Sequence, residues 1–185
     1  TTELNLADFF RLNGISYEAL PIETNDEGKE NLFAGRCDVY TTDASGLSST
    51  RAAASNPDKW VVLPEIISKE PLGPLVRHGD HQWGDVVRWS LNAMIIAEEL
   101  GITSENVDAQ MSSNVPEVLR LLGVEGNYGE MLELSNDWAY QIIKQIGNYS
   151  ESYEANVGPD TPLEIARGLN ALWTQGGILY APPFR

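Results

Sequence analysis

The spacing of apolar residues predicts alternating helices and strands in the first third of the chain. A helix is expected from Thr1 or Thr2 to Leu12, because apolar side chains recur at helical spacing and Asn13-Gly14 favours a left-handed stop. Apolar, partly alternating stretches predict three strands, at Ile15–Glu23, Cys37–Thr41 and Trp60–Ile67. Helices are expected between them, one of them capped by Asn25-Asp26-Glu27 and closed by Gly35, the other over Ser45–Ala54. This order predicts an α/β fold with a mostly parallel sheet.

The pattern changes after Lys69–Pro74, where two prolines and a glycine resist a helix and favour an extended connection. A domain crossing is therefore predicted there. The next apolar stretch, Gln82–Leu100, has helical spacing, with Asp80 as its expected cap and Gly101 as its stop. The rest predicts further helices, at Ser104–Met111, Pro116–Leu122, Trp138–Ile146 and Pro162–Trp173.

Composition then narrows the classes of function. The chain has 185 residues, and 12 basic against 27 acidic side chains give a formal net charge of -15. Such a charge repels phosphate backbones and anionic lipid surfaces, so a nucleic-acid-binding protein is not expected. No apolar run approaches the ~18 residues of a membrane span.

Cysteine and histidine give little support for catalysis or metal binding. A single cysteine, Cys37, excludes an intramolecular disulfide framework and is interpreted as a packed strand residue rather than a nucleophile. His78 and His81 flank Gly79-Asp80, and the nearby sequence supplies no further ligands at the spacing that a metal needs. We therefore predict no metal site and no cofactor.

Two helix starts are better candidates for ligand chemistry, because open α/β sheets bind ligands beyond the carboxyl ends of their strands. Thr1 and Thr2 bring hydroxyls and unpaired backbone N–H groups that suit a small anion such as a carboxylate. Asp43 follows a predicted strand and suits a cation. Plain helix capping is the alternative for both, favoured for the threonines and evenly balanced for Asp43.

The same places resemble a known family. Thr1-Thr2-Glu3 looks like a Gly-Thr-Thr-x-Glu turn without its first residue, and Ala34–Asp43 (AGRCDVYTTD) is similar to the Ala-Gly-Arg-x-Asp stretch of polar amino-acid-binding proteins, which are type II periplasmic solute receptors of ABC importers. Three later segments resemble the general L-amino-acid-binding branch of that family, Val62–Pro74, Gly168–Trp173 and Tyr180–Pro183. The resemblance covers essentially the whole chain.

The resemblance implies a two-lobed periplasmic binding protein fold. Residues 1–68 would form most of lobe two as a parallel-rich α/β lobe, 69–77 the hinge crossing, and 78–185 a return to lobe one with a largely helical C-terminal tail. It also implies that Thr1 contacts the ligand's carboxylate, that Thr2 lines the pocket, and that Asp43 takes the α-ammonium. The arginine that pairs with the carboxylate would lie outside this sequence.

The implied function is the substrate-binding component of an amino-acid importer. It would capture L-amino acids in the periplasm, deliver them to the permease subunits of the membrane and perform no catalysis, and its precursor would carry a signal peptide. Two alternatives use the same fold: an enzyme resembling cyclohexadienyl dehydratase, and an amino-acid-sensing module of a regulator.

The start of the chain adds one more expectation. A domain rarely begins at a helix N-cap, and an α/β pattern expects a strand before it, so the sequence is interpreted as a truncated domain lacking the N-terminal part of lobe one. A sheet without that strand has an unpaired edge, which predicts a strand-exchanged homo-oligomer.

Overall fold

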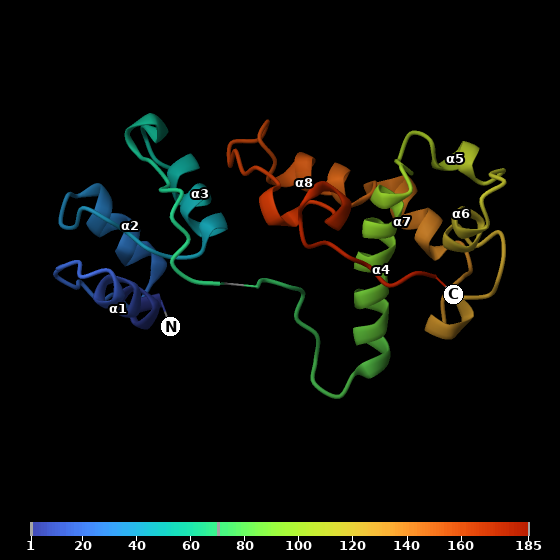
Figure 1. Cartoon of the computed structure of the whole chain (residues 1–185), viewed down its shortest axis with the longest axis horizontal. Helices are drawn as coiled ribbons and strands as arrows, with labels where there is room; N and C mark the ends of the chain where they lie inside the picture. Colours follow the sequence, from blue (N-terminus) through green and yellow to red (C-terminus); the bar gives the residue numbers. More distant parts are fainter. Residues whose placement is uncertain (1, 70, 185) are drawn as a thin grey trace. The chain divides into compact units, whose positions relative to one another are not determined.

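The computed structural model describes residues 2–69 and 71–184, which divide into two compact units, Thr1–Leu72 and Gly73–Arg185. We call them unit 1 and unit 2. Their boundary falls inside the segment 69–77 that the prolines mark as a crossing. Figure 1 shows unit 1 from blue to green and unit 2 from green to red.

Helices form in unit 1 close to where apolar spacing and capping residues predict them. They are α1 (Thr2–Leu12), α2 (Asn25–Phe33), α3 (Ala44–Ala52) and the short 3₁₀ helix η1 (Pro57–Lys59). Gly14, at φ 63°, takes the left-handed conformation expected after α1. The N-cap of α2 is Thr24, which precedes the predicted Asn25–Glu27 run, and its Oγ1 accepts a 3.2 Å bond from the N–H of Glu27. Glu27, a member of that run, contributes to the cap, because its Oε2 accepts from the N–H of Glu23 at 3.2 Å.

The predicted sheet is absent from the part of the chain that the structure describes, so the α/β prediction is corrected to a mostly helical structure. Ile15–Glu23, Cys37–Thr41 and Trp60–Ile67 are free of helix but form no ladder with one another. A strand requires a neighbour about 4.8 Å away that accepts and donates its backbone hydrogen bonds. The apolar pattern of the sequence correctly predicted that these segments are not helical. The pattern does not show whether a neighbouring strand is present.

Unit 1 has no hydrophobic core among its described residues. The buried positions in 2–69 and 71–72 are Gly28, Asn31, Ser48 and Thr50, with no apolar side chain among them. Ordering a residue's backbone costs about 1–2 kcal/mol, whereas burying a large apolar side chain contributes about 1.5–3 kcal/mol. The apolar side chains of this unit meet instead in partly exposed ring contacts. In one of these the ring centroids of Phe33 and Trp60 lie 5.1 Å apart.

Unit 2 is a bundle of helices around α4, the longest helix of the described chain. Its elements are α4 (His81–Glu99), α5 (Val107–Gln110), α6 (Pro116–Leu121), η2 (Glu130–Leu132), α7 (Trp138–Ile146), α8 (Tyr149–Asn156), η3 (Gly168–Asn170) and η4 (Trp173–Gln175). The predicted ends of α4 are confirmed. Asp80 Oδ1 accepts from the N–H of Trp83 at 3.1 Å, and Gly101 has φ 67°.

The core of unit 2 joins α4, α6 and α7 to the last described residues. Ala93, Leu122 and Ile143 are fully buried in it. Phe184, 4% exposed, packs at ring-centroid distances of 5.2–5.9 Å from the side chains of Trp89, Tyr128 and Trp138. Arg120 Nε donates to the backbone carbonyl of Phe184 at 3.1 Å, so the terminal segment is fixed by both apolar and polar contacts.

A buried ion pair ties the C-terminal segment to α4. Arg167 Nη2 lies 3.0 Å from both carboxylate oxygens of Glu98, and both side chains are largely removed from water. The guanidinium also lies 5.3 Å from the ring centroids of Tyr149 and Tyr153, which is cation–π geometry. Partners on several sides satisfy the buried charge.

Two expectations for unit 2 were wrong. The helix predicted at Pro162–Trp173 does not form, because Glu164 and Gly168 have φ of 51° and 49° and a parallel bridge pairs Leu172 with Leu179. Conversely α8 was missed, since its sequence carries few apolar residues. Asn148 and Glu151 form a capping box there, with bonds of 2.9 and 2.8 Å, and this spacing was the available signal.

The contribution of this core to the stability of unit 2 can be tested by shortening a side chain at its centre. The variant Ile143→Ala is expected to lower the free energy of unfolding of unit 2 by about 2–5 kcal/mol, because Ile143 is fully buried and its removal leaves a cavity. Chemical denaturation followed by tryptophan fluorescence measures the change. Leu75→Ala, at a side chain that is 99% exposed, is the matched control and should stay within about 0.5 kcal/mol.

Candidate functional site

Asp43 is the predicted site residue that the structure describes best. It precedes α3 with extended backbone angles, and its Oδ2 accepts bonds from Ser45 Oγ at 2.8 Å and from the N–H of Gly46 at 3.0 Å. Thr42 Oγ1 donates to Oδ1 at 3.2 Å. The helix-capping alternative is therefore confirmed for Asp43, which caps α3 whether or not it also binds a ligand.

The same contacts keep Asp43 ionised. The Ser45 hydroxyl, followed by the Gly46 N–H and the Thr42 hydroxyl, lowers the pKa of the Asp43 carboxyl below 3.8, although partial burial opposes the shift. A carboxylate offers about four acceptor positions, and three are occupied here. The half-buried Asp43 thus remains a charged group that can accept a bond from a cation.

Glycine at position 46 allows the carboxylate to approach the helix start. A Cβ at Gly46 would lie 3.1 Å from Thr42 Cγ2 and 3.2 Å from Asp43 Oδ2, which is tighter than ordinary contact. Thr50 Oγ1 bonds the carbonyl of Gly46 at 2.8 Å one turn later. The first turn of α3 is therefore fixed around the carboxylate.

The threonine half of the predicted site is only partly described. Thr1 lies outside the described residues, and Thr2 is the half-buried first residue of α1. In the described part of the chain no hydrogen bond joins Thr2 to Asp43. The geometry of a shared site for a zwitterion therefore stays a prediction.

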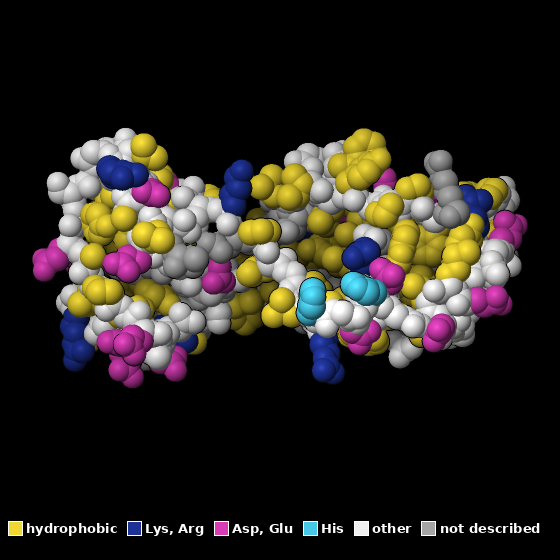
Figure 2. All heavy atoms as spheres, turned by 90° about the horizontal axis from the view of Figure 1, so that it is seen from below, with side chains coloured by type: hydrophobic (Ala, Val, Ile, Leu, Met, Phe, Trp, Pro, Cys, Tyr) yellow, Lys and Arg dark blue, Asp and Glu magenta, His cyan; other side chains and the backbone are white. Residues whose placement is uncertain are grey.

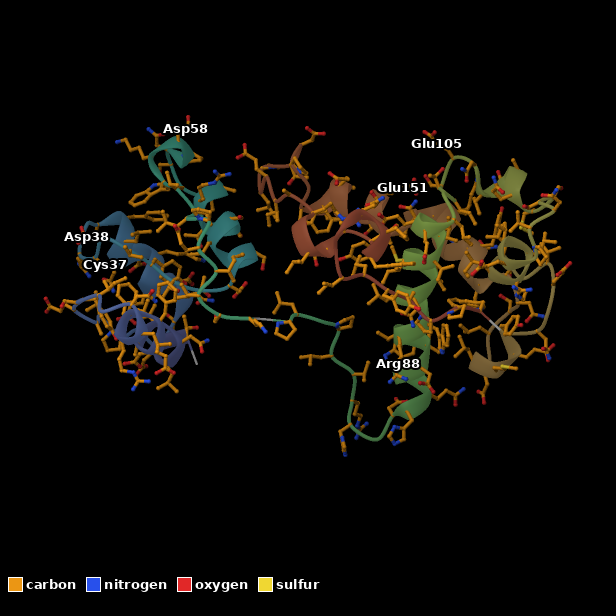
Figure 3. The ribbon with its side chains drawn as sticks, viewed as in Figure 1. Cys37, Asp38, Asp58, Arg88, Glu105 and Glu151 are labelled. Carbon is orange, nitrogen blue, oxygen red and sulfur yellow. The ribbon has the colours of Figure 1, made fainter. Side chains whose placement is uncertain are left out.

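Glu151 in unit 2 is a second carboxylate that is held by several hydrogen-bond donors. Its two oxygens accept from the N–H and Oγ of Ser104 at 2.6–3.1 Å and from the N–H of Asn148 at 2.8 Å. Asn148 is buried and donates to the carbonyl of Ile102 at 2.8 Å. These bonds connect α8 to the loop after α4. Figure 3 labels Glu151 in α8 and Glu105 in that loop.

A recess of about 430 Å³ lies at the start of α4, between Val76 and Arg88. Figure 2 shows the histidine side chains at this surface. Its acids already have partners: Asp80 caps α4, and Asp85 Oδ1 lies 3.1 Å from Arg88 Nη1. Sequence reasoning did not select this recess, and because both of its acids already have partners, it gives no reason to prefer it to Asp43.

In residues 2–69 and 71–184, no three histidine, cysteine, aspartate or glutamate side chains lie together in a way that suits a metal ion. None of the helices in those residues is long and apolar enough to cross a bilayer.

No family model matches the chain. Curated relatives match all of it, however. It is 56% identical to the glutamate/glutamine/aspartate/asparagine-binding protein BztA of Rhodobacter capsulatus and 56% identical to the general L-amino acid-binding periplasmic protein AapJ of Rhizobium johnstonii, covering 55% of each. The chain is homologous to part of a periplasmic amino-acid-binding protein.

Further comparisons agree with this family. The putative amino-acid ABC transporter-binding protein YhdW of Escherichia coli K12 is 54% identical over the whole chain, which covers 54% of YhdW. A solved ABC transporter periplasmic binding protein from Brucella ovis with glutathione bound superposes with a TM-score of 0.94 at 51% identity, over all of this chain and 58% of that one. The chain thus has the fold of part of a periplasmic binding protein and spans about half the length of its relatives.

The origin of the low pKa gives a prediction for Asp43. Replacing Ser45→Ala removes the donor with the largest effect, so the pKa of Asp43 should rise towards 3.8. Because the pKa is lowered by folding, the carboxylate's stabilising effect is complete above the unfolded pKa and is lost as the pH falls through the folded one. Carboxyl ¹³C shifts in an NMR pH titration measure this, and an unchanged pKa in the variant would contradict the assigned cause.

Proposed function

We propose that the chain forms part of the periplasmic receptor of an amino-acid ABC importer. The observation that carries the proposal is the match of the entire chain, at 54–56% identity, to three amino-acid-binding proteins. The partners are an L-amino acid and the permease subunits of the membrane. The relatives are binding proteins rather than enzymes, which argues against the dehydratase alternative.

The ligand's ammonium group binds Asp43 in this proposal. The carboxylate is ionised at neutral pH and keeps an acceptor position open after capping α3, which supports this role. Thr1 and Thr2, at the start of α1, would donate to the ligand's carboxylate, where the helix dipole favours negative charge. A zwitterion needs both an acceptor and donors, and the two helix starts supply them.

The two units would act as parts of two lobes. In this proposal residues 1–68 belong to lobe two, 69–77 form one hinge crossing, and 78–185 return to lobe one. Contacts of the ligand with both lobes favour a closed form, which the permease then recognises. The strand-exchanged homo-oligomer is not part of the proposal, because nothing in the comparisons supports it, and it stays a prediction.

A γ-glutamyl peptide is a second candidate ligand. The related Brucella ovis protein was solved with glutathione bound, and its match is as extensive as those of the amino-acid-binding relatives. Glutathione carries the same α-amino-acid group as glutamate, so Asp43 would play the same role. A competition experiment distinguishes these two candidate ligands.

Asp43→Asn tests the proposed ammonium site. Asparagine is also a good N-cap, so α3 should persist while the charge that faces the ammonium is lost. We expect a 10²- to 10⁴-fold weaker affinity, as roughly 2–5 kcal/mol is lost when one partner of a desolvated charge pair is removed. The protein is this chain joined to the part of BztA outside the match, and calorimetry with L-glutamate and then glutathione measures binding.

The matched control is Asp58→Asn in η1, which Figure 3 labels at a separate place in unit 1. It removes the same charge without touching the start of α3 and should leave affinity unchanged. Equal affinity of the Asp43→Asn and parent proteins would reject Asp43 as the ammonium site. If the protein bound glutathione but not glutamate, glutathione rather than an amino acid would be the ligand.

A further inference from the structure

The chain leaves α1, the blue helix at its start in Figure 1, through Asn13 and Gly14. Gly14 has φ 63°, and the N–H of Ile15 donates back to the carbonyl of Phe10 at 2.9 Å, which is the Schellman arrangement of a helix end. This pair does more than end the helix. It places the side-chain amide of Asn13 next to the backbone nitrogen of Gly14.

The backbone nitrogen that follows an asparagine can attack the amide carbon Cγ of that asparagine and close a cyclic imide. The residue that carries the nitrogen controls this reaction, because its Cβ crowds the attack and a branched Cβ crowds it further. Glycine has no Cβ and leaves the nitrogen open. Asn13 is the only asparagine in the sequence that is followed by glycine.

The surroundings of Gly14 leave its nitrogen accessible. Asn13 and Gly14 are both exposed, and a Cβ built on Gly14 would have no atom within 4 Å beyond those of its chain neighbours. The N–H of Gly14 donates to the carbonyl of Arg11 at 3.3 Å, which is longer than the usual range of about 2.7–3.2 Å. Water and a base in solution can therefore reach this nitrogen, and the hydrogen bond that it must give up is a weak one.

One hydrogen bond holds the side chain of Asn13 to α1, and the end of α8 repeats it. Asn13 Nδ2 donates to the carbonyl of Phe9 at 2.8 Å, and Asn156 Nδ2 donates to the carbonyl of Ser152 at 2.7 Å. Asn156 is also exposed, but the residue after it is the β-branched, half-buried Val157. The two asparagines thus share their exposure and their hydrogen bond, and they differ in the residue that follows.

We propose that Asn13-Gly14 is a site of spontaneous covalent modification, at which the amide of Asn13 becomes a carboxylate. In the first step the Gly14 nitrogen gives its proton to a base in solution and bonds to Asn13 Cγ, while Nδ2 takes up a proton and leaves as ammonia. In the second step water adds to one of the two carbonyl carbons of the cyclic imide. The bond from that carbon to the Gly14 nitrogen breaks, and the nitrogen regains a proton.

The carbon that water attacks decides the product. Addition at Cγ gives aspartate, and addition at the main-chain carbon gives isoaspartate, in which the backbone runs through Cβ and Cγ of residue 13. Water is the only co-reactant that is consumed, ammonia is the only molecule released, and no group is oxidised or reduced.

Either product changes the end of α1. A carboxylate at position 13 lies at the negative end of the helix dipole, where cations rather than anions are favoured. Isoaspartate also lengthens the backbone before Gly14, which moves the N–H of Ile15 away from the carbonyl of Phe10 and disturbs the ring pair Phe10–Tyr17, whose centroids are 4.8 Å apart. The modification therefore weakens the helix at the end opposite to Thr2.

Storage of the 185-residue chain in warm buffer at neutral pH tests the proposal. Peptide mass spectrometry measures the fraction of Asn13 and of Asn156 that has become an acid. Protein isoaspartyl methyltransferase with labelled S-adenosylmethionine then marks any isoaspartate. We expect Asn13 to lose its amide at least about tenfold faster than Asn156, with the methyl label in the peptide that holds residue 13.

Three variants examine the cause and the consequence. Val157→Gly gives Asn156 a glycine neighbour and should accelerate its amide loss about tenfold or more, whereas Asn13→Gln should remove the methyl label. Asn13→Asp reproduces the charge of the product, and hydrogen–deuterium exchange in the last turn of α1 should become about two- to fivefold faster. Amides in the core of unit 2 are the internal reference and show that each variant is folded.

Equal rates of amide loss at Asn13 and Asn156 in the parent chain would overturn the proposal, and so would a methyl label that persists in Asn13→Gln. Amide loss from Asn156 that stays as slow in folded Val157→Gly as in the parent would reject the role given to glycine. The comparison of Asn13 with Asn156 in the parent chain decides the matter even if Val157→Gly does not fold. The test uses no amino acid, so its outcome is independent of the ligand site proposed at Asp43.

Discussion

The removal of apolar side chains from water organises the described residues of unit 2 but not those of unit 1. In unit 2 α4 packs against α7, α8 and Phe184, and the polar groups buried there find partners nearby. In unit 1 the helices form from local capping, with Thr24 and Asp43 at the starts of α2 and α3, but enclose no apolar core. Local structure is therefore fixed in unit 1, although its described residues form neither a sheet nor an apolar core.

The two well-partnered carboxylates, Glu151 and Asp43, differ in which parts of the chain their hydrogen bonds join. Glu151 receives donors on both oxygens from two neighbouring segments, and so its capacity is spent on joining α8 to the loop after α4. Asp43 also accepts from three donor groups, but all of them belong to Thr42–Gly46 at the start of its own helix, and these bonds keep the carboxylate charged. Capping uses Oδ2, so capacity is left on Oδ1 for the ammonium group that the proposed function places there.

Elements with strong local signals were predictable from the sequence. The apolar spacing and the Asp80 and Gly101 ends gave α4 to within a residue or two, and α7 has the predicted bounds. The absence of strand pairing was not predictable. Trp60–Ile67 has the apolar pattern of a strand, but its backbone hydrogen bonds need a neighbouring strand, and no local signal shows whether one is present. At the site, the role of Asp43 as a cap followed from its position after an extended segment. Whether Asp43 lies close to Thr2 depends on tertiary placement, which the spacing of residues in the sequence does not fix.

The position of Phe184 has a consequence for the order of events during synthesis. Its ring completes a cluster with Trp89, which the ribosome makes 95 residues earlier, so the part of α4 around Trp89 stays uncovered until Phe184 has been made. The nascent polypeptide thus exposes this apolar part of α4 while the 95 residues between Trp89 and Phe184 are made. A protein that is exported unfolded would tolerate this delay, because the incomplete core leaves this part of the chain easier to unfold until Phe184 is in place.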